Sequence, residues 1–88
     1  MKRYRDLIVW QKGVDMVVGI YDVTRLLPDE EKWGLVSQMR RCAISIPSNI
    51  AEGYGRGATR DYSRFLKIAA GSCNELETQL EICDLPRF

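Results

Sequence analysis

The feature that most constrains this chain is the spacing of apolar side chains in its last third. From residue 62 to residue 83 they recur at intervals of 4-3-4-3-4-3, in the order Tyr62, Leu66, Ala69, Cys73, Leu76, Leu80 and Cys83. A heptad repeat of this kind places the apolar side chains on one face of an α-helix and suits packing against a nearly antiparallel neighbour. The spacing predicts a helix over residues 60–83 that other helices must cover.

Two earlier segments show the same helical period of about 3.6 residues. The first is predicted over residues 6–26, with Asp6 as its N-cap, and the second over residues 30–53. Pro47 lies inside the second and lacks an N–H, so this helix must kink or restart there; we favour a kinked continuation. Short connections make consecutive helices antiparallel. The sequence therefore predicts a single all-α domain over residues 1–88, an up-down antiparallel helical bundle.

A glycine-rich run, GYGRG at residues 53–57, separates the second and third predicted helices. Such a run can cradle a phosphate, but the known phosphate fingerprints need a preceding strand, and none is predicted here. The run is better interpreted as a turn that ends the second helix. Gly53 or Gly55 is expected to take the left-handed conformation, and Thr59 is expected to cap the third helix.

Composition excludes several classes of function. The chain has no histidine, and its three cysteines, Cys42, Cys73 and Cys83, are widely spaced and odd in number. They are interpreted as small buried hydrophobes in a reducing compartment rather than as metal ligands or disulfide partners. Because no nucleophile, base and orienting residue can be assembled, we predict no catalytic residue, metal or cofactor. No apolar run approaches the roughly 20 residues of a membrane span, so we expect a cytoplasmic protein.

Charge is unevenly distributed along the chain. The net charge is only +1, yet residues 32–67 hold seven basic and two acidic side chains, a local excess of 7 − 2 = +5. The candidate nucleic-acid-binding residues are Arg40, Arg41, Arg56, Arg60, Arg64 and Lys67. Such a surface predicts weak, salt-dependent and sequence-tolerant binding of RNA or DNA. It is equally compatible with ordinary solvated surface, or with patches that meet between subunits.

The adjacent pair Arg40 and Arg41 has a second interpretation. Neighbouring helical positions diverge by about 100 degrees, so the two guanidinium groups cannot face one partner together. One of them can pair with an acid such as Glu75 or Glu77 across the bundle. A structural role is therefore as well supported as phosphate contact.

Large apolar and aromatic side chains are interpreted as packing residues. The candidates for the core or for a subunit interface are Trp10, Tyr21, Leu66, Leu76 and Leu80, and Trp33 is assigned to the same class rather than to base stacking. A chain of 88 residues removes only about 60 to 65 per cent of its unfolded surface from water, so self-association would add stability.

Three stretches carry a resemblance to a known family. DLIVWQKGVDMVVGIY, GLVSQMRRCAISIPSNIAEGYGR and FLKIAAGSCNELETQL resemble the bacterial four-helix-bundle proteins encoded by intervening sequences within 23S ribosomal RNA genes, over residues 6–82. The accessory protein of diversity-generating retroelements is similar in fold. The resemblance implies a homo-oligomeric ring, typically a pentamer, with a basic surface toward nucleic acid and no catalytic activity. Family members continue into a fourth helix, which here is missing or supplied by another chain.

Two functions from different classes follow. The first is a non-enzymatic scaffold associated with nucleic acid through its basic face. The alternative is a protein–protein adaptor that captures a partner helix without touching nucleic acid.

Overall fold

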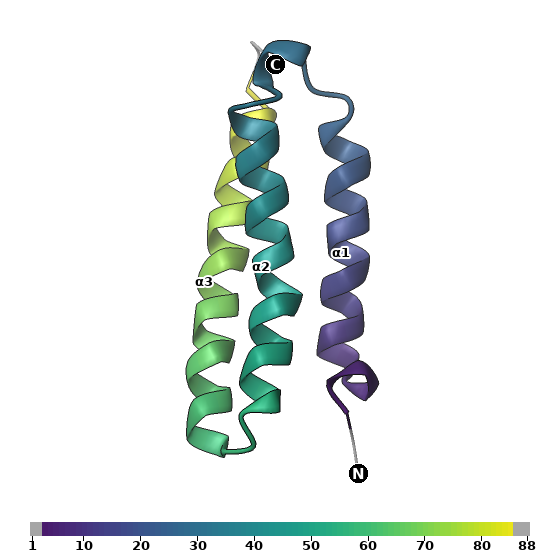
Figure 1. The fold of residues 1–88 in the computed structure, drawn as a ribbon. Coiled ribbons are helices and arrows are strands. Elements are labelled where there is room, and N and C mark those ends of the chain that lie inside the picture. Colours follow the sequence, from purple (N-terminus) through teal and green to yellow (C-terminus); the bar gives the residue numbers. More distant parts are fainter. Residues whose placement is uncertain (1–2, 86–88) are drawn as a thin grey trace.

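The computed structural model describes residues 3–85, which form three long helices. These are α1 (Ile8–Thr24), α2 (Leu35–Gly55) and α3 (Thr59–Cys83), and the chain runs up, down and up again along them (Figure 1). No strand occurs within the described residues. The predicted all-α antiparallel bundle is confirmed. None of the helices in residues 3–85 is long and apolar enough to cross a membrane.

Helix α2 lies in the middle of the arrangement and packs against both neighbours. Within residues 3–85, the backbones of α1 and α3 do not approach each other closely. The core cluster comes mainly from α2 and consists of Ile20, Met39, Cys42, Ala43, Ile46, Ile50, Ala69 and Leu76. The side chains of Met39 and Ile50 are 0% and 2% exposed, and burial of each contributes about 1.5–3 kcal/mol. The bundle therefore depends on the two faces of a single helix.

Pro47 is accommodated inside α2 by a glycine on α1. The sequence left two alternatives at Pro47, a continued helix or a restart, and α2 continues through Pro47. The Pro47 ring is buried. A Cβ placed on Gly13 would lie 3.3 Å from the Pro47 Cβ. The missing side chain of Gly13 thus leaves room for the ring at the point where the two helices meet.

The ends of the first two helices differ from the prediction. The N-cap of α1 is Leu7, because Asp6 belongs to a separate 3-10 turn (Tyr4–Asp6) in which its carboxylate accepts a hydrogen bond from the Arg3 N–H at 3.1 Å. The helix also ends two residues earlier than expected. Helix α2 begins at residue 35 rather than 30, since Asp29–Glu31 forms another 3-10 turn and Gly34 is not helical (φ −106, ψ −105).

The turn between α2 and α3 uses a different glycine from those predicted. Gly57 has the positive φ of 78 degrees, and its N–H donates to the Tyr54 carbonyl at 3.3 Å. Gly53 and Gly55 are both helical, so that prediction was wrong. Thr59 is the first helical residue rather than the N-cap, because Ala58 already holds the extended capping conformation (φ −118, ψ 135).

The predicted packing residues fall into three groups. Leu76 is in the core at 3% exposed. Trp10 and Leu66 are half-buried and pack against the core, and Tyr21 is half-buried on α1. Leu80 is 37% exposed and lies outside the core of the protomer. Its predicted place in a subunit interface stays a prediction.

The cysteines are free thiols, and Cys42 is buried as expected, whereas Cys73 and Cys83 are only half-buried. Its Sγ donates to the Ser72 carbonyl at 3.1 Å. Burial raises the pKa of the Cys42 thiol, and the Glu75 carboxylate adds to this effect. Burial also raises the pKa of Cys83. In the described part of the chain, no three cysteine or carboxylate side chains gather to hold a metal ion.

The close contact of Gly53 with Phe65 yields a stability test. A Cβ at Gly53 would lie 2.5 Å from the Phe65 Cβ, a separation that real side chains do not tolerate. We expect Gly53→Ala to force α2 and α3 apart at a cost of about 1–3 kcal/mol, which exceeds the gain of about 1 kcal/mol in helix propensity. Chemical denaturation followed by circular dichroism should show a lower free energy of unfolding.

The matched control is Gly71→Ala in the middle of α3, where an added Cβ meets nothing within 4 Å. This change should raise the free energy of unfolding by up to about 1 kcal/mol. Equal stabilisation by both substitutions would contradict the close contact between α2 and α3.

Candidate nucleic-acid interface

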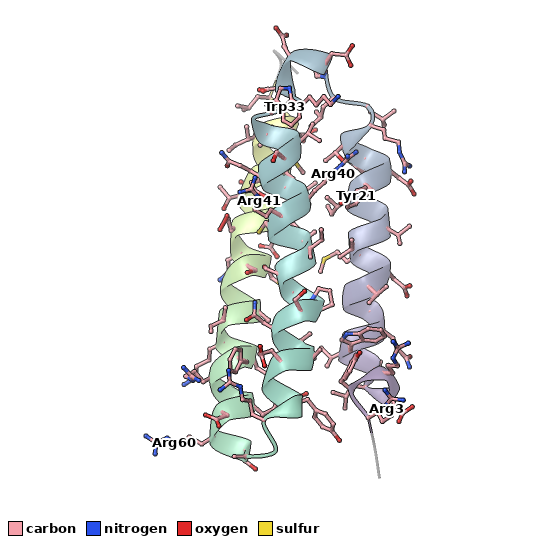
Figure 2. The ribbon with its side chains drawn as sticks, in the orientation of Figure 1. Arg3, Tyr21, Trp33, Arg40, Arg41 and Arg60 are labelled. Carbon is pink, nitrogen blue, oxygen red and sulfur yellow. The ribbon has the colours of Figure 1, made fainter. Side chains whose placement is uncertain are left out.

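The six predicted basic residues lie in two separate regions of a rod-like molecule 48 Å long. Figure 2 shows Arg40 and Arg41 near the start of α2, far from Arg60 at the start of α3. Arg56, Arg64 and Lys67 belong to the second region, around the α2–α3 turn and the first turns of α3. The structure therefore does not bring the six together into one site.

At the α2–α3 turn, two of the arginines are held by local partners. The guanidinium carbons of Arg56 and Arg64 lie 5.1 and 5.0 Å from the centroid of the Phe65 ring. Carboxylates offset both charges: Glu52 lies 3.5 Å from Arg56, and Asp61 lies 3.9 Å from Arg64. The net positive charge of this region is consequently smaller than the number of arginines indicates.

Arg40 connects α2 to α1. Its Nε donates to the Thr24 hydroxyl at 2.9 Å, and its Nη2 donates to the Tyr21 carbonyl at 3.5 Å. The guanidinium carbon lies 4.3 Å from the centroid of the Tyr21 ring. Thr24 is 2% exposed and donates its own hydroxyl proton to the Ile20 carbonyl at 2.7 Å. These contacts hold Arg40 in one orientation, with a role in the fold.

The predicted carboxylate partners are absent from this arrangement. Among the described residues, neither Arg40 nor Arg41 forms an ion pair with Glu75 or Glu77. Arg41 instead donates from Nη2 to the Ser37 hydroxyl at 3.0 Å, one turn back along α2. Arg41 is exposed, so its charge faces solvent.

Beside Arg40 and Arg41 lies an open pocket of about 340 Å³, which we call the α1–α2 groove. It is lined by Tyr21, Lys32, Trp33, Ser37, Arg40 and Arg41, with Val36 and Ile44 as its apolar part. Three of these residues are cations, and none of the described residues that line the groove carries a carboxylate. The groove therefore combines positive charge, aromatic rings and an apolar surface.

Trp33 was predicted to lie in the core or in a subunit interface, and only the first of these alternatives is wrong. Its side chain is 86% exposed, so it is not part of the protomer core, and its place in a subunit interface stays a prediction. Figure 2 shows it at the end of the bundle where α2 begins. The Lys32 Nζ lies 5.4 Å from the centroid of the indole ring. The available signal was its position in the turn, before Gly34, outside the apolar stripe of the second helix.

A second open pocket, of about 500 Å³, lies on the α2–α3 side and shares Trp33, Ser37 and Arg41 with the α1–α2 groove. This pocket differs in charge because Glu75 lines it. Its hydroxyl groups are also engaged: Ser45 donates to the Ser72 oxygen at 2.7 Å. The α1–α2 groove is thus the more cationic of the two.

Comparison with known proteins identifies the family. A search of curated proteins finds no match. The sequence profile described as 23S rRNA-intervening sequence protein matches residues 5–85, which covers all three helices. The chain belongs to the 23S rRNA-intervening sequence protein family.

Proposed function

We propose that the protein is a non-enzymatic, cytoplasmic scaffold that binds RNA or DNA through the α1–α2 groove. The observation that supports this most directly is the grouping of Lys32, Arg40 and Arg41 in a groove with no carboxylate among its described lining residues, in a chain whose net charge is only +1. Phosphate groups are the anions that such a cluster attracts along a nucleic-acid backbone. The free thiols agree with a reducing compartment.

The three cations play different parts in this proposal. Arg40 is oriented by Thr24 and Tyr21, and its Nη1 group donates to none of the described residues. A pre-positioned guanidinium loses little freedom when it meets a phosphate. Lys32 and Arg41 are exposed and line the groove together with Trp33, so they add two solvent-facing charges to it. The exposed Arg60 and Lys67 on α3 add weaker, non-specific contacts.

A charge-reversal experiment tests the groove. We expect Lys32→Glu/Arg41→Glu to lower affinity for nucleic acid at least tenfold at low salt, without disturbing the contacts of Arg40. For the unaltered protein and a single strand, contacts from three cations predict a slope of log affinity against log salt of about −2, and loss of two of them should reduce its magnitude by about 1.4. Fluorescence polarisation of a labelled oligonucleotide across a salt series measures both quantities.

The matched control is Arg60→Glu/Lys67→Glu, which changes the net charge by the same amount on α3. It should weaken binding less than the groove variant. Equal losses would show that total charge, not the groove, controls binding. Absence of binding by the unaltered protein at low salt would overturn the proposed function.

A second candidate function is protein–protein contact, either as an adaptor or within a homo-oligomer such as the family's pentamer. Val23 follows the buried Ile20 by three residues and is 42% exposed, and Leu80 follows the buried Leu76 by four. Val23 and Leu80 therefore lie at the edge of the buried face of α1 and of α3, respectively. Because α1 and α3 do not pack on each other, these edges offer apolar surface to a fourth helix or to another subunit.

Replacement of Leu80 tests this candidate. Since Leu80 is partly exposed, Leu80→Asp should leave the protomer folded and reduce the mass measured by light scattering. Leu26→Asp is the control, because Leu26 is 85% exposed and lies beyond the end of α1. An unaltered protein that has the protomer mass at all concentrations and salt levels would contradict self-association.

A further inference from the structure

We propose that the α1–α2 groove binds an unpaired nucleobase stacked on the indole ring of Trp33, so that the nucleic-acid ligand is single-stranded. This inference rests on the proposed function and specifies its ligand. It starts from the 86% exposure of Trp33, a ring whose burial would otherwise stabilise the fold. An aromatic side chain left in solvent beside a basic pocket is the arrangement on which bases stack.

The groups around Trp33 suit the separate parts of a nucleotide, namely its base and its phosphates. Val36, which is 7% exposed, and Ile44 give the groove an apolar lining suited to a planar base. The Lys32 Nζ lies 5.4 Å from the centroid of the indole ring, and Arg41 lines the same groove, so both cations are available to the phosphates next to a stacked base. The Ser37 hydroxyl, which accepts from Arg41 at 3.0 Å, adds a polar group at the rim.

Stacking on Trp33 requires a base whose face is free. In a duplex, each base face is already covered by its neighbours, whereas a flexible single strand can turn one base toward an aromatic ring. The α1–α2 groove is an open pocket of about 340 Å³. Among the described residues, no helix or β-ribbon projects from it that could enter the major or minor groove of a duplex. The geometry therefore favours single strands over duplexes.

The charges that line the groove favour an anionic ligand over an apolar protein surface. Lysine is depleted from the centres of protein interfaces, although tryptophan and arginine are enriched there. Lys32, Arg40 and Arg41 line the groove, and no acid is among the described residues that line it. Burial of these three charges against another protein would be costly without matching acids on that protein.

Tryptophan fluorescence provides the test, because the chain has only two tryptophans. Trp10→Phe leaves Trp33 as the sole reporter, and phenylalanine retains an aromatic ring against Tyr4, which lies 5.3 Å from Trp10 between centroids. We expect oligouridine to quench Trp33 emission at the same concentrations at which polarisation detects binding. A blunt duplex with the same number of phosphates should leave the emission unchanged.

Two further variants complete the experiment. Trp33→Phe keeps only Trp10, whose emission should not respond to oligouridine. Trp33→Ala should lower the affinity for oligouridine about tenfold and leave any duplex binding unchanged. Since the Trp33 side chain is exposed, the thermal unfolding midpoint of the Trp33→Ala variant should match that of the unaltered protein.

The possible results distinguish failure of the stacking site from failure of the proposed function. If oligouridine binds without quenching Trp33 and Trp33→Ala binds equally well, the stacking site is wrong and the proposed function stands. If neither nucleic acid binds at low salt, both are wrong. If Trp33 emission changes with protein concentration in the absence of nucleic acid, the ring belongs to a protein contact and the stacking site is overturned.

Discussion

The structure depends on the packing of α2 against two helices that do not pack on each other. Two glycines make this possible: Gly13 leaves space for the ring of Pro47, and Gly53 brings α2 close to Phe65. Close approach on both faces of α2 buries Met39 completely, along with its neighbours in the core. It also places α1 beside the first turns of α2, where Arg40 reaches across the interface. The cationic groove is thus a product of the same packing that stabilises the bundle.

The fold was largely predictable because helical periodicity is a strong signal where it is uninterrupted. The heptad spacing predicted a helix over residues 60–83, and α3 spans Thr59–Cys83. Helix ends were less predictable, since several residue types nearby can end or cap a helix. Three glycines lie within five residues, and each of them can take the left-handed conformation. Gly53 is helical where it packs against Phe65, and Gly57 is the one with a positive φ. Such a choice depends on tertiary contact rather than local preference.

The candidate site was predictable only as a set of charges. Sequence identified Arg40 and Arg41 but not their different roles, because the contact of Arg40 with Thr24 joins residues 16 positions apart. The sequence count included Glu52 and Asp61, but only the structure shows that these two acids lie beside Arg56 and Arg64 at the α2–α3 turn and that no acid is among the described residues that line the groove. Trp33 was assigned to the core or to a subunit interface, and its place outside the apolar stripe of the second helix was the signal against the core.

We propose that this member of the 23S rRNA-intervening sequence protein family binds nucleic acid between α1 and α2. Chemical-shift mapping by NMR with a single-stranded oligonucleotide tests it most directly, because it reports on every region at once. The account predicts that the largest changes occur at the Trp33 indole N–H and at Ser37 and Arg41, which line the groove. Changes centred on Arg60 and Lys67 of α3, with the Trp33 signal unmoved, would contradict it.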